Sequence, residues 1–436
     1  MTALEQPARA GGPVRPPARI PFPVVDEVAR HCHQEAEPET VHIEVHLPGR
    51  LEPGRLRTAF AEALRRHPRI LMREAPGPWY RRRYEWELTP EPDVEVVSFP
   101  APDRDGIKHA RARALDSAPP LSASPPIRLE VVDERDGASA LVLTVNHTAL
   151  DGPACLRVLA TAAELYGGRD NSPTAPPTRP PDAPEAPADT PSVWAPPARV
   201  APGTPEASPG NGLLVTELTV PHRPKGSPYT VNDQLMITTA LMIAHWNREH
   251  GARPRPMRIT MPVDDRPRGS DMPIGNGTRL VEVTFAPEEL SHEPDRMGEL
   301  LRRTADRTRA LKALPRPQLG HGAVLLTAPV VPVAWRAALT RGLRRAAGPW
   351  TSTTLLSNIG RIPYVLDFGE AAGRAHAVWF SAPARMPRGL TVTTASTAGR
   401  LHVALRWSRT LLSHGDGAHL RDLFEHYLHT TEVERT

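Results

Sequence analysis

Cysteine and long apolar runs are both scarce in this chain of 436 residues. The two cysteines, Cys32 and Cys155, are too few for a disulfide framework or a cysteine zinc site, so the sequence favours a reducing, cytoplasmic compartment. The most apolar stretch starts at Ala323 and is short and interrupted by proline, which excludes a membrane span there. Residues 1–19 are rich in Pro, Ala and Arg rather than in apolar residues, and we expect a disordered leader instead of a signal peptide.

Lysine is also rare, with only three residues, so the net charge of +4 comes almost entirely from arginine. One interpretation is the codon bias of a GC-rich genome. The other is a surface for an acidic partner or a phosphate-bearing ligand, because arginine binds such groups in a bidentate manner. The arginines are scattered and accompany no nucleic-acid motif, so a nucleic-acid partner is not expected.

Proline, in contrast, is abundant and unevenly distributed. Between residues 171 and 210, 13 of 40 residues are proline and few are large and apolar, so this stretch cannot form a core. The length of the chain also favours two domains. We therefore predict an N-terminal lobe over 20–170, a proline-rich linker over 171–212 and a C-terminal lobe over 213–436.

Both halves show the pattern of a mixed α/β fold. In the first half, residues 41–47 alternate as a strand does, a helix pattern follows and stops before Pro68, and an Asp-Gly turn separates two strands at 128–134 and 140–145. In the second half, a strand at 212–220 precedes a long amphipathic helix that we expect to be capped near Asn232.

The sequence "TVNHTALDG" lies where a predicted strand gives way to a predicted helix. His147 would be held there by rigid backbone, and an imidazole can take a proton from an attacking amine or hydroxyl. Asp151 equally suits a purely structural role as the helix N-cap. From these residues alone, the catalytic and the structural interpretations both stand.

The motif "VNHTALDG" resembles the HHxxxDG motif of the condensation-domain superfamily, which includes chloramphenicol acetyltransferase. Four further segments resemble that family in the same order. They are "LRTAFAEALRRHPRIL", "YTVNDQLMITTALMIAHW", "MPVDDRPRGSDMPIGN" and "TLLSNIGRIP". The resemblance implies two chloramphenicol-acetyltransferase-like lobes that form a V around a central tunnel.

The resemblance also implies roles for individual residues. His147 matches the presumed base, Asp151 the motif aspartate, which orders the turn by pairing with an arginine such as Arg266, and Gly152 the motif glycine, where a side chain would crowd the tunnel. Asn358, beside Ser357, matches a polar element that the second lobe brings to the substrate. Asn146 stands in place of the first histidine, where we expect it to support the loop beside the substrate; it can form hydrogen bonds but cannot titrate.

The implied activity is transfer of an acyl group from a thioester to an amine or hydroxyl in natural-product biosynthesis, giving an amide or an ester. The donor would be carried on the phosphopantetheine of a carrier protein met in trans, or on coenzyme A, and no metal or bound cofactor is expected. The alternative is a non-catalytic protein of the same fold that recruits a partner enzyme to a carrier protein. We expect neither a nucleic-acid nor a membrane partner.

Overall fold

The computed structural model describes residues 18–33, 37–169, 195–264, 266, 272, 274–290, 296–313 and 326–432. Most of the predicted leader and residues 171–194 of the predicted linker lie outside these ranges. The first strand already begins at Arg19. No helix within the described ranges is long and apolar enough to cross a bilayer.

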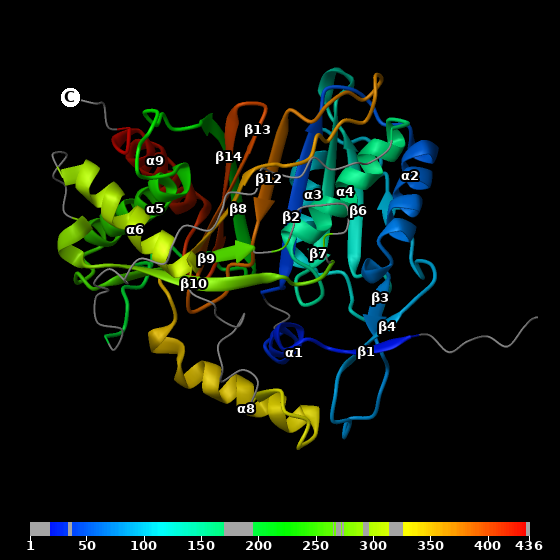
Figure 1. Cartoon of the computed structure of the whole chain (residues 1–436), viewed down its shortest axis with the longest axis horizontal. Coiled ribbons are helices and arrows are strands. Elements are labelled where there is room, and N and C mark those ends of the chain that lie inside the picture. The colour runs from blue at the N-terminus through cyan, green and yellow to red at the C-terminus, as the bar shows by residue number, and fades with distance from the viewer. Residues whose placement is uncertain are drawn as a thin grey trace, which may run out of the picture.

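Two large mixed sheets form the framework of the molecule (Figure 1). The first sheet has the order β12 (Ala377–Ser381), β2 (Thr40–Leu47), β7 (Ser139–Asn146), β6 (Ile127–Asp133) and β5 (Val97–Ser98). The second has the order β10 (Thr278–Phe285), β9 (Met257–Asp264), β11 (Thr354–Arg361), β13 (Leu390–Thr397), β14 (Arg400–Ser408) and β8 (Asn211–Thr219). A small third sheet consists of β1 (Arg19–Pro21), β4 (Glu85–Leu88) and β3 (Met72–Glu74).

Helices cover both large sheets. In the first lobe, α2 (Pro53–Arg66) packs on α4 (Gly152–Tyr166), and α3 (Gly106–Asp116) contacts β2, β6 and β7. In the second lobe, α5 (Val231–Glu249) packs against both α6 (Met297–Ala313) and α9 (His414–Thr430). Each lobe thus has its own apolar core of buried side chains.

The predicted strands and helices are confirmed where the sequence pattern is local. Strand β2 and helix α2 fall where the alternation and the helical spacing place them, and Leu56, Phe60 and Leu64 are the buried face of α2. The N-cap of α5 is Thr230 rather than Asn232, because Thr230 and Asp233 form a capping box with reciprocal hydrogen bonds.

The two lobes are less separate than the predicted boundaries. Strand β12 comes from the second half of the chain but pairs antiparallel with β2 of the first sheet, from Ala377 opposite His46 to Ser381 opposite His42. It also contacts β13 and β14 of the second sheet. The predicted C-terminal lobe therefore supplies an edge strand to the N-terminal lobe.

The end of the predicted linker is also part of the second lobe. Ala198, Val200 and Ala201 are buried, and the Ala201 amide donates to Asn247 Oδ1 of α5 over 2.8 Å. Strand β8 then starts at Asn211, before the predicted end of the linker at 212.

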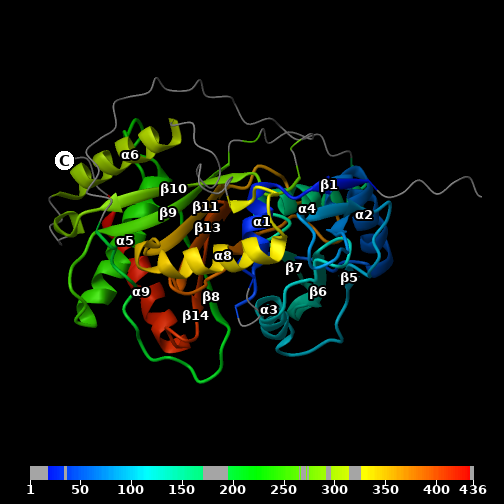
Figure 2. The same ribbon diagram turned by 90° about the horizontal axis from the view of Figure 1, so that it is seen from below.

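A pair of helices lies beneath both lobes. Helix α8 (Val333–Ala346) runs beside α1 (Val24–His31), and Figure 2 shows α8 along the face seen from below. A buried ion pair of 2.8 Å between Arg336 and Glu27 joins the two helices. A segment far along the chain is thus anchored to the N-terminal region.

Candidate functional site

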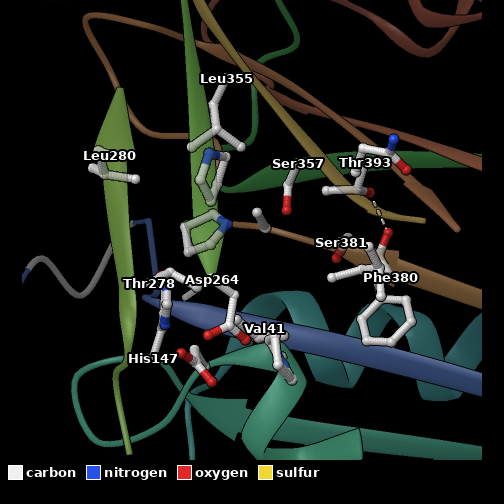
Figure 3. Close-up of a pocket in the computed structure, with 18 of the residues that line it drawn as sticks. Val41, His147, Asp264, Thr278, Leu280, Leu355, Ser357, Phe380, Ser381 and Thr393 are labelled. Carbon is white, nitrogen blue, oxygen red and sulfur yellow. Dashed lines mark hydrogen bonds between the residues drawn. The ribbon is translucent and has the colours of Figure 1, made fainter. Parts of the chain in front are cut away.

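A cavity of about 300 Å³ is lined by residues from both halves of the chain. His147, Asp151 and Gly152 come from the turn between β7 and α4, whereas Ser357 and Asn358 come from β11. Figure 3 shows His147, Asp264, Ser357 and Ser381 around the same space. The site residues predicted from the two halves therefore meet at one cavity, except for Asn146 and Arg266, which do not line it.

His147 is the first residue after β7 and is half-buried. Its backbone amide donates to the Glu39 carbonyl over 2.7 Å, and its Nδ1 lies 3.0 Å from the Leu150 carbonyl oxygen. Since a carbonyl only accepts, Nδ1 carries the proton in this contact and Nε2 of the neutral ring keeps its lone pair. Nε2 forms no hydrogen bond with any described residue. The imidazole is thus oriented as a base would be.

Both carboxylate oxygens of Asp151 are occupied by hydrogen bonds. Oδ1 accepts from the Ala154 amide over 3.0 Å and so caps α4. Oδ2 accepts from Arg266 Nη2 over 2.7 Å and from the Gly277 amide over 2.9 Å. The expected contact between Asp151 and Arg266 is present, and the bonds of Asp151 go to the turn and its neighbours rather than to His147.

Arg266 links Asp151 to the loop after β9. Its guanidinium also contacts Asp264, with 2.8 Å from Nε to Oδ1, and donates to the Gly275 carbonyl over 3.0 Å. Burial alone would lower the pKa of Arg266, but the bonds to Asp264 and Asp151 raise it above its usual value. A Cβ at Gly277 would lie 2.3 Å from Arg266 Nε, so only glycine fits beneath this side chain.

Asn276 is a supporting residue that the sequence reasoning did not single out. Its Nδ2 donates to the carbonyl oxygens of Thr148 and His147 over 3.0 and 3.2 Å and to Asp26 Oδ1 over 2.9 Å. It therefore fastens the His147 turn to both the second lobe and α1. In the sequence, only the Gly-Asn pair at 275–276, which ends the segment "MPVDDRPRGSDMPIGN", could have pointed to this residue.

Asp26 is a buried carboxylate next to this turn. It accepts hydrogen bonds from Asn276 and, over 2.8 Å, from Trp86 Nε1. Burial outweighs these two bonds and raises the pKa of Asp26 to about 6. Its charge state therefore changes close to neutral pH.

Asn146, which we expect to support the loop beside the substrate, does not line this cavity. It is the last residue of β7, His147 follows it, and the two residues border different hollows. Its Nδ2 donates to the Pro119 carbonyl over 2.9 Å and its Oδ1 accepts from the Thr148 amide over 3.1 Å. It borders a different hollow, with Pro119 and Leu121. The predicted role as loop support fits this geometry.

The second lobe presents two neighbouring polar residues at an irregularity of β11, where the register with β13 shifts between Asn358 and Gly360. Asn358 is engaged locally, because its Oδ1 accepts from the Gly360 amide over 2.8 Å and its Nδ2 donates to Asn232 Oδ1 over 3.2 Å. The Ser357 hydroxyl lines the cavity and bonds to no described residue. Ser357 is therefore the more available donor of the two.

Ser381, at the end of β12, was missed from the sequence. Its buried hydroxyl lacks a hydrogen-bond partner within the described part of the chain and belongs to the cavity lining. Only the pairing of β12 with β2 brings it there, and no local pattern signals that pairing.

Gly152 lines the cavity, but the expected crowding is not found. A Cβ at this position would lie 3.5 Å from Phe380 Cδ1 and 3.9 Å from Val41 Cγ1, which are ordinary van der Waals distances. A methyl group therefore fits in the space next to Phe380.

Two further residues with potentially reactive side chains are buried away from this site. His31 is buried, and burial lowers its pKa to about 4. Cys155 is fully buried on α4, where burial raises the pKa of the thiol well above its usual value, so it is no nucleophile. Within the described residues, no group of three His, Cys, Asp or Glu side chains could hold a metal ion.

Sequence comparisons give an uncharacterized relative over most of the chain and a peptide synthetase over about a third of it. No protein-family model matches the chain. The uncharacterized protein Rv2305 of Mycobacterium tuberculosis (strain ATCC 25618 / H37Rv) is 28% identical over 385 residues, which cover 80% of this chain and 84% of that protein. The probable nonribosomal peptide synthetase (NRPS) CymA of Salinispora arenicola is 29% identical over 154 residues, or 32% of this chain and 2% of CymA.

Solved structures show the fold. The condensation domain of the Monacolin K polyketide synthase MokA matches with a TM-score of 0.61 and 13% identity, covering 95% of this chain and 97% of that one. The first condensation domain of the CDA synthetase gives 0.59 with 15% identity and 95% and 96% coverage. TRI3 trichothecene 15-O-acetyltransferase from Fusarium sporotrichioides gives 0.64 with 10% identity and 95% and 96% coverage. The chain has the fold of condensation domains and of this acetyltransferase, as its sequence predicted.

Proposed function

We propose that the protein is an acyltransferase that moves an acyl group from a carrier-protein or coenzyme A thioester to an amine or hydroxyl acceptor. The observation that carries this proposal is the orientation of His147. Its Nδ1 is held by the Leu150 carbonyl, and its Nε2 remains available at a cavity lined by both halves of the chain. Natural-product biosynthesis is the context that the similar condensation domains suggest.

In the proposed reaction, the nitrogen or oxygen of the acceptor forms a bond to the carbonyl carbon of the thioester. At the same time, Nε2 of His147 takes the proton from that acceptor atom. The resulting oxyanion is stabilised by hydrogen-bond donors that line the cavity, with the hydroxyls of Ser357 and Ser381 as candidates beside Asn358. The intermediate then collapses, the carbon–sulfur bond breaks, and the leaving sulfur receives the proton from His147. The products are an amide or ester and a free thiol.

The alternative, a recruiting protein without activity, was based on the replacement of the first motif histidine by Asn146. Because Asn146 points away from the cavity and supports the turn through Pro119 and Thr148, its presence removes no titratable group from the cavity. The geometry therefore favours the catalytic proposal.

A carrier protein could dock on helix α8. Trp335, Leu339 and Leu343 are exposed and four residues apart, so they form one apolar stripe on its outer face. The sequence contains no Asp or Glu over residues 307–366, so every Lys, Arg, Asp or Glu of α8 and of the segments that flank it is basic. Arg344 of the same helix lines the cavity. We propose that an acidic carrier protein binds this outer face and that its phosphopantetheine arm reaches the cavity from there.

Replacement of the proposed base tests the reaction. We expect His147→Ala to lower turnover by about 10² or more with an unchanged melting temperature, because the side chain makes one backbone contact and is only half-buried. Intact-mass measurement of products from acyl-carrier and acyl-CoA donors, with pooled amines and alcohols, gives the readout. His429→Ala, at an exposed histidine of α9, is the matched control. A His147→Ala variant as active as the wild type would refute the mechanism.

A further inference from the structure

Three arginines gather at one part of the cavity lining. Arg344, Arg385 and Arg388 all line it, and the acid Glu39 lies beside them. Arg385 is already neutralised, because it forms an ion pair with Glu39 and donates to the Cys32 carbonyl over 2.7 Å. The other two arginines leave an excess of positive charge at this end of the cavity.

Among the described residues, only neutral hydroxyl groups hold Arg388. Its Nη2 donates to Ser352 Oγ over 2.9 Å and to Thr260 Oγ1 over 3.4 Å, and its Nε lies 3.3 Å from the same Ser352 oxygen. Its Nη1 makes no hydrogen bond to any residue that the structure describes, and no described carboxylate lies within 4.0 Å of the side chain. These two hydroxyls position the guanidinium without neutralising it.

Other enclosed arginines of this chain have more of their donors occupied. Arg266 contacts Asp151 and Asp264, and Arg336 contacts Glu27. Arg406 has no carboxylate partner among the described residues, but its Nε, Nη1 and Nη2 all donate to oxygen atoms. A charge removed from water is normally paired or fully hydrogen-bonded, because its desolvation is otherwise costly. Arg388 differs from these arginines in that its Nη1 makes no hydrogen bond to a described residue.

Arg344 strengthens the positive charge of this region. It forms no ion pair with a described carboxylate, and its charge opposes that of Arg388. Burial, together with the charge of Arg344, lowers the pKa of Arg388 to about 10, while Glu282 acts in the opposite direction. Arg388 therefore remains charged at neutral pH.

We propose that Arg388 and Arg344 form a subsite for an anionic group of the substrate, either a phosphate or a carboxylate. The proposal rests on the cavity being the substrate site of the proposed function. A planar guanidinium with a free Nη1 edge suits both oxyanions, and a bound anion would supply the missing negative charge.

The position of the subsite limits what can carry the anionic group. Thr260, which contacts Arg388, is four residues from Asp264 on β9, and Asp264 contacts Arg266 beside the His147 turn. At about 3.3 Å per residue these two strand positions are roughly 13 Å apart. The anionic group is therefore remote from the reacting carbonyl, as a pantetheine phosphate is, or as a carboxylate at the far end of an acceptor or acyl chain would be.

Binding calorimetry with paired probes tests the subsite and identifies its source. The first pair is 4′-phosphopantetheine and pantetheine, and the second is N-acetyl-leucine and its amide, so each pair differs in the anionic group. We expect the charged member of one pair to bind about tenfold more tightly or better. A preference in the first pair identifies the phosphate of the donor arm, and one in the second identifies a substrate carboxylate.

Variants test whether the preference for the charged probe arises from Arg388 and Arg344. We expect Arg388→Met to abolish it and Arg344→Met to weaken it, whereas Arg253→Met, at an exposed arginine before β9, leaves it unchanged. Absence of any preference in the wild type, or its survival in Arg388→Met, would overturn the proposal. Because the assay needs no turnover, it separates the failure of this subsite from the failure of the proposed acyl transfer.

Thermal unfolding of the same variants distinguishes a binding role from a structural one. Since Arg388 carries an enclosed charge and pairs with no carboxylate of the described ranges, we expect Arg388→Met to melt at the wild-type temperature or higher. A marked fall in melting temperature would show that Arg388 serves the fold, and would count against the subsite.

Discussion

Asn146 shows how a residue can support the turn that carries His147 while pointing away from the cavity. Alanine at this position leaves the Thr148 amide and the Pro119 carbonyl without their side-chain partner in a buried setting. We expect Asn146→Ala to cost about 1–3 kcal/mol of stability and to lower turnover less than His147→Ala does. Chemical denaturation and steady-state rates measure the two effects.

Asn146→Asp is the matched variant, because it keeps the acceptor for the Thr148 amide but places a carboxylate oxygen where the donor to Pro119 was. Asn146→His, which we expect to be tolerated, offers one ring nitrogen to each partner. A loss of rate in Asn146→Ala as large as that of His147→Ala, in a folded protein, would instead assign Asn146 a direct task in the reaction.

Asp26 gives the protein a pH response that can be tested. Its folded-state pKa of about 6 lies above the ordinary value of 3.8, so folding favours its protonated, neutral form. Below pH 4 the group is protonated in both states. Between about pH 4 and pH 6 the unfolded chain ionises first, and stability on the order of 3 kcal/mol is lost as the pH rises.

The melting temperatures of wild type and Asp26→Asn, measured from pH 4 to pH 7, isolate this effect from other titrating groups. We expect the difference between them to shift in favour of the variant as the pH rises through that window. A difference that stays constant with pH would mean that Asp26 is ionised in the folded protein throughout.

Residues between β9 and β10 stabilise the start of α4 through more than one contact. This segment brings Arg266 and the Gly277 amide to Asp151, which is also the N-cap of α4. We expect Asp151→Ala to cost several kcal/mol, about 3–5, because the cap is lost and Arg266 loses a buried partner. The loss should appear in both melting temperature and turnover.

Asp151→Asn separates the two contributions. Asparagine caps a helix well but cannot neutralise Arg266, so it should retain the capping share of the stability and lose the ionic share. An Asp151→Ala variant with the melting temperature of the wild type would show that the loop does not stabilise this turn.

The elements that could be predicted from the sequence are those whose signals are local. The alternation of β2 and the spacing of α2 lie within single stretches of chain, and the proline and glycine at the ends of α4 mark its bounds. The contact between Asn276 and Asp26 joins residues 250 positions apart, and Arg388 reaches the cavity only through the packing of both lobes. Such contacts depend on tertiary structure and leave no periodic pattern in the sequence.

At the scale of the whole molecule, its charge should determine how it meets its donor. If an acidic carrier protein docks on α8, encounter is accelerated by opposite charges and slows with salt, because exposed charges are screened beyond about 10 Å at 0.1 M. We expect turnover with a carrier-bound acyl group to exceed that with the matching coenzyme A thioester at low salt. The advantage should shrink at moderate salt.

Variants on α8 make this test specific. Trp335→Ala and Arg345→Glu should lower turnover with the carrier-bound donor and leave that with coenzyme A nearly unchanged, while Arg253→Glu, an exposed position before β9, serves as the control. Equal efficiency of the two donors at low salt would identify coenzyme A as the donor and attribute the arginine excess to genome composition.

The pairing of β12 with β2 has a consequence for how the chain is made. The last residue of β7 is Asn146, but β12 ends at Ser381, so 235 residues must be added before the first sheet gains its edge strand. At bacterial or eukaryotic synthesis rates of about 5–20 residues per second, this takes roughly 12–47 s. During that interval the free edge of β2 can pair with another nascent chain. The first lobe is thus translated early and completed late, which makes chaperone supply a determinant of its yield.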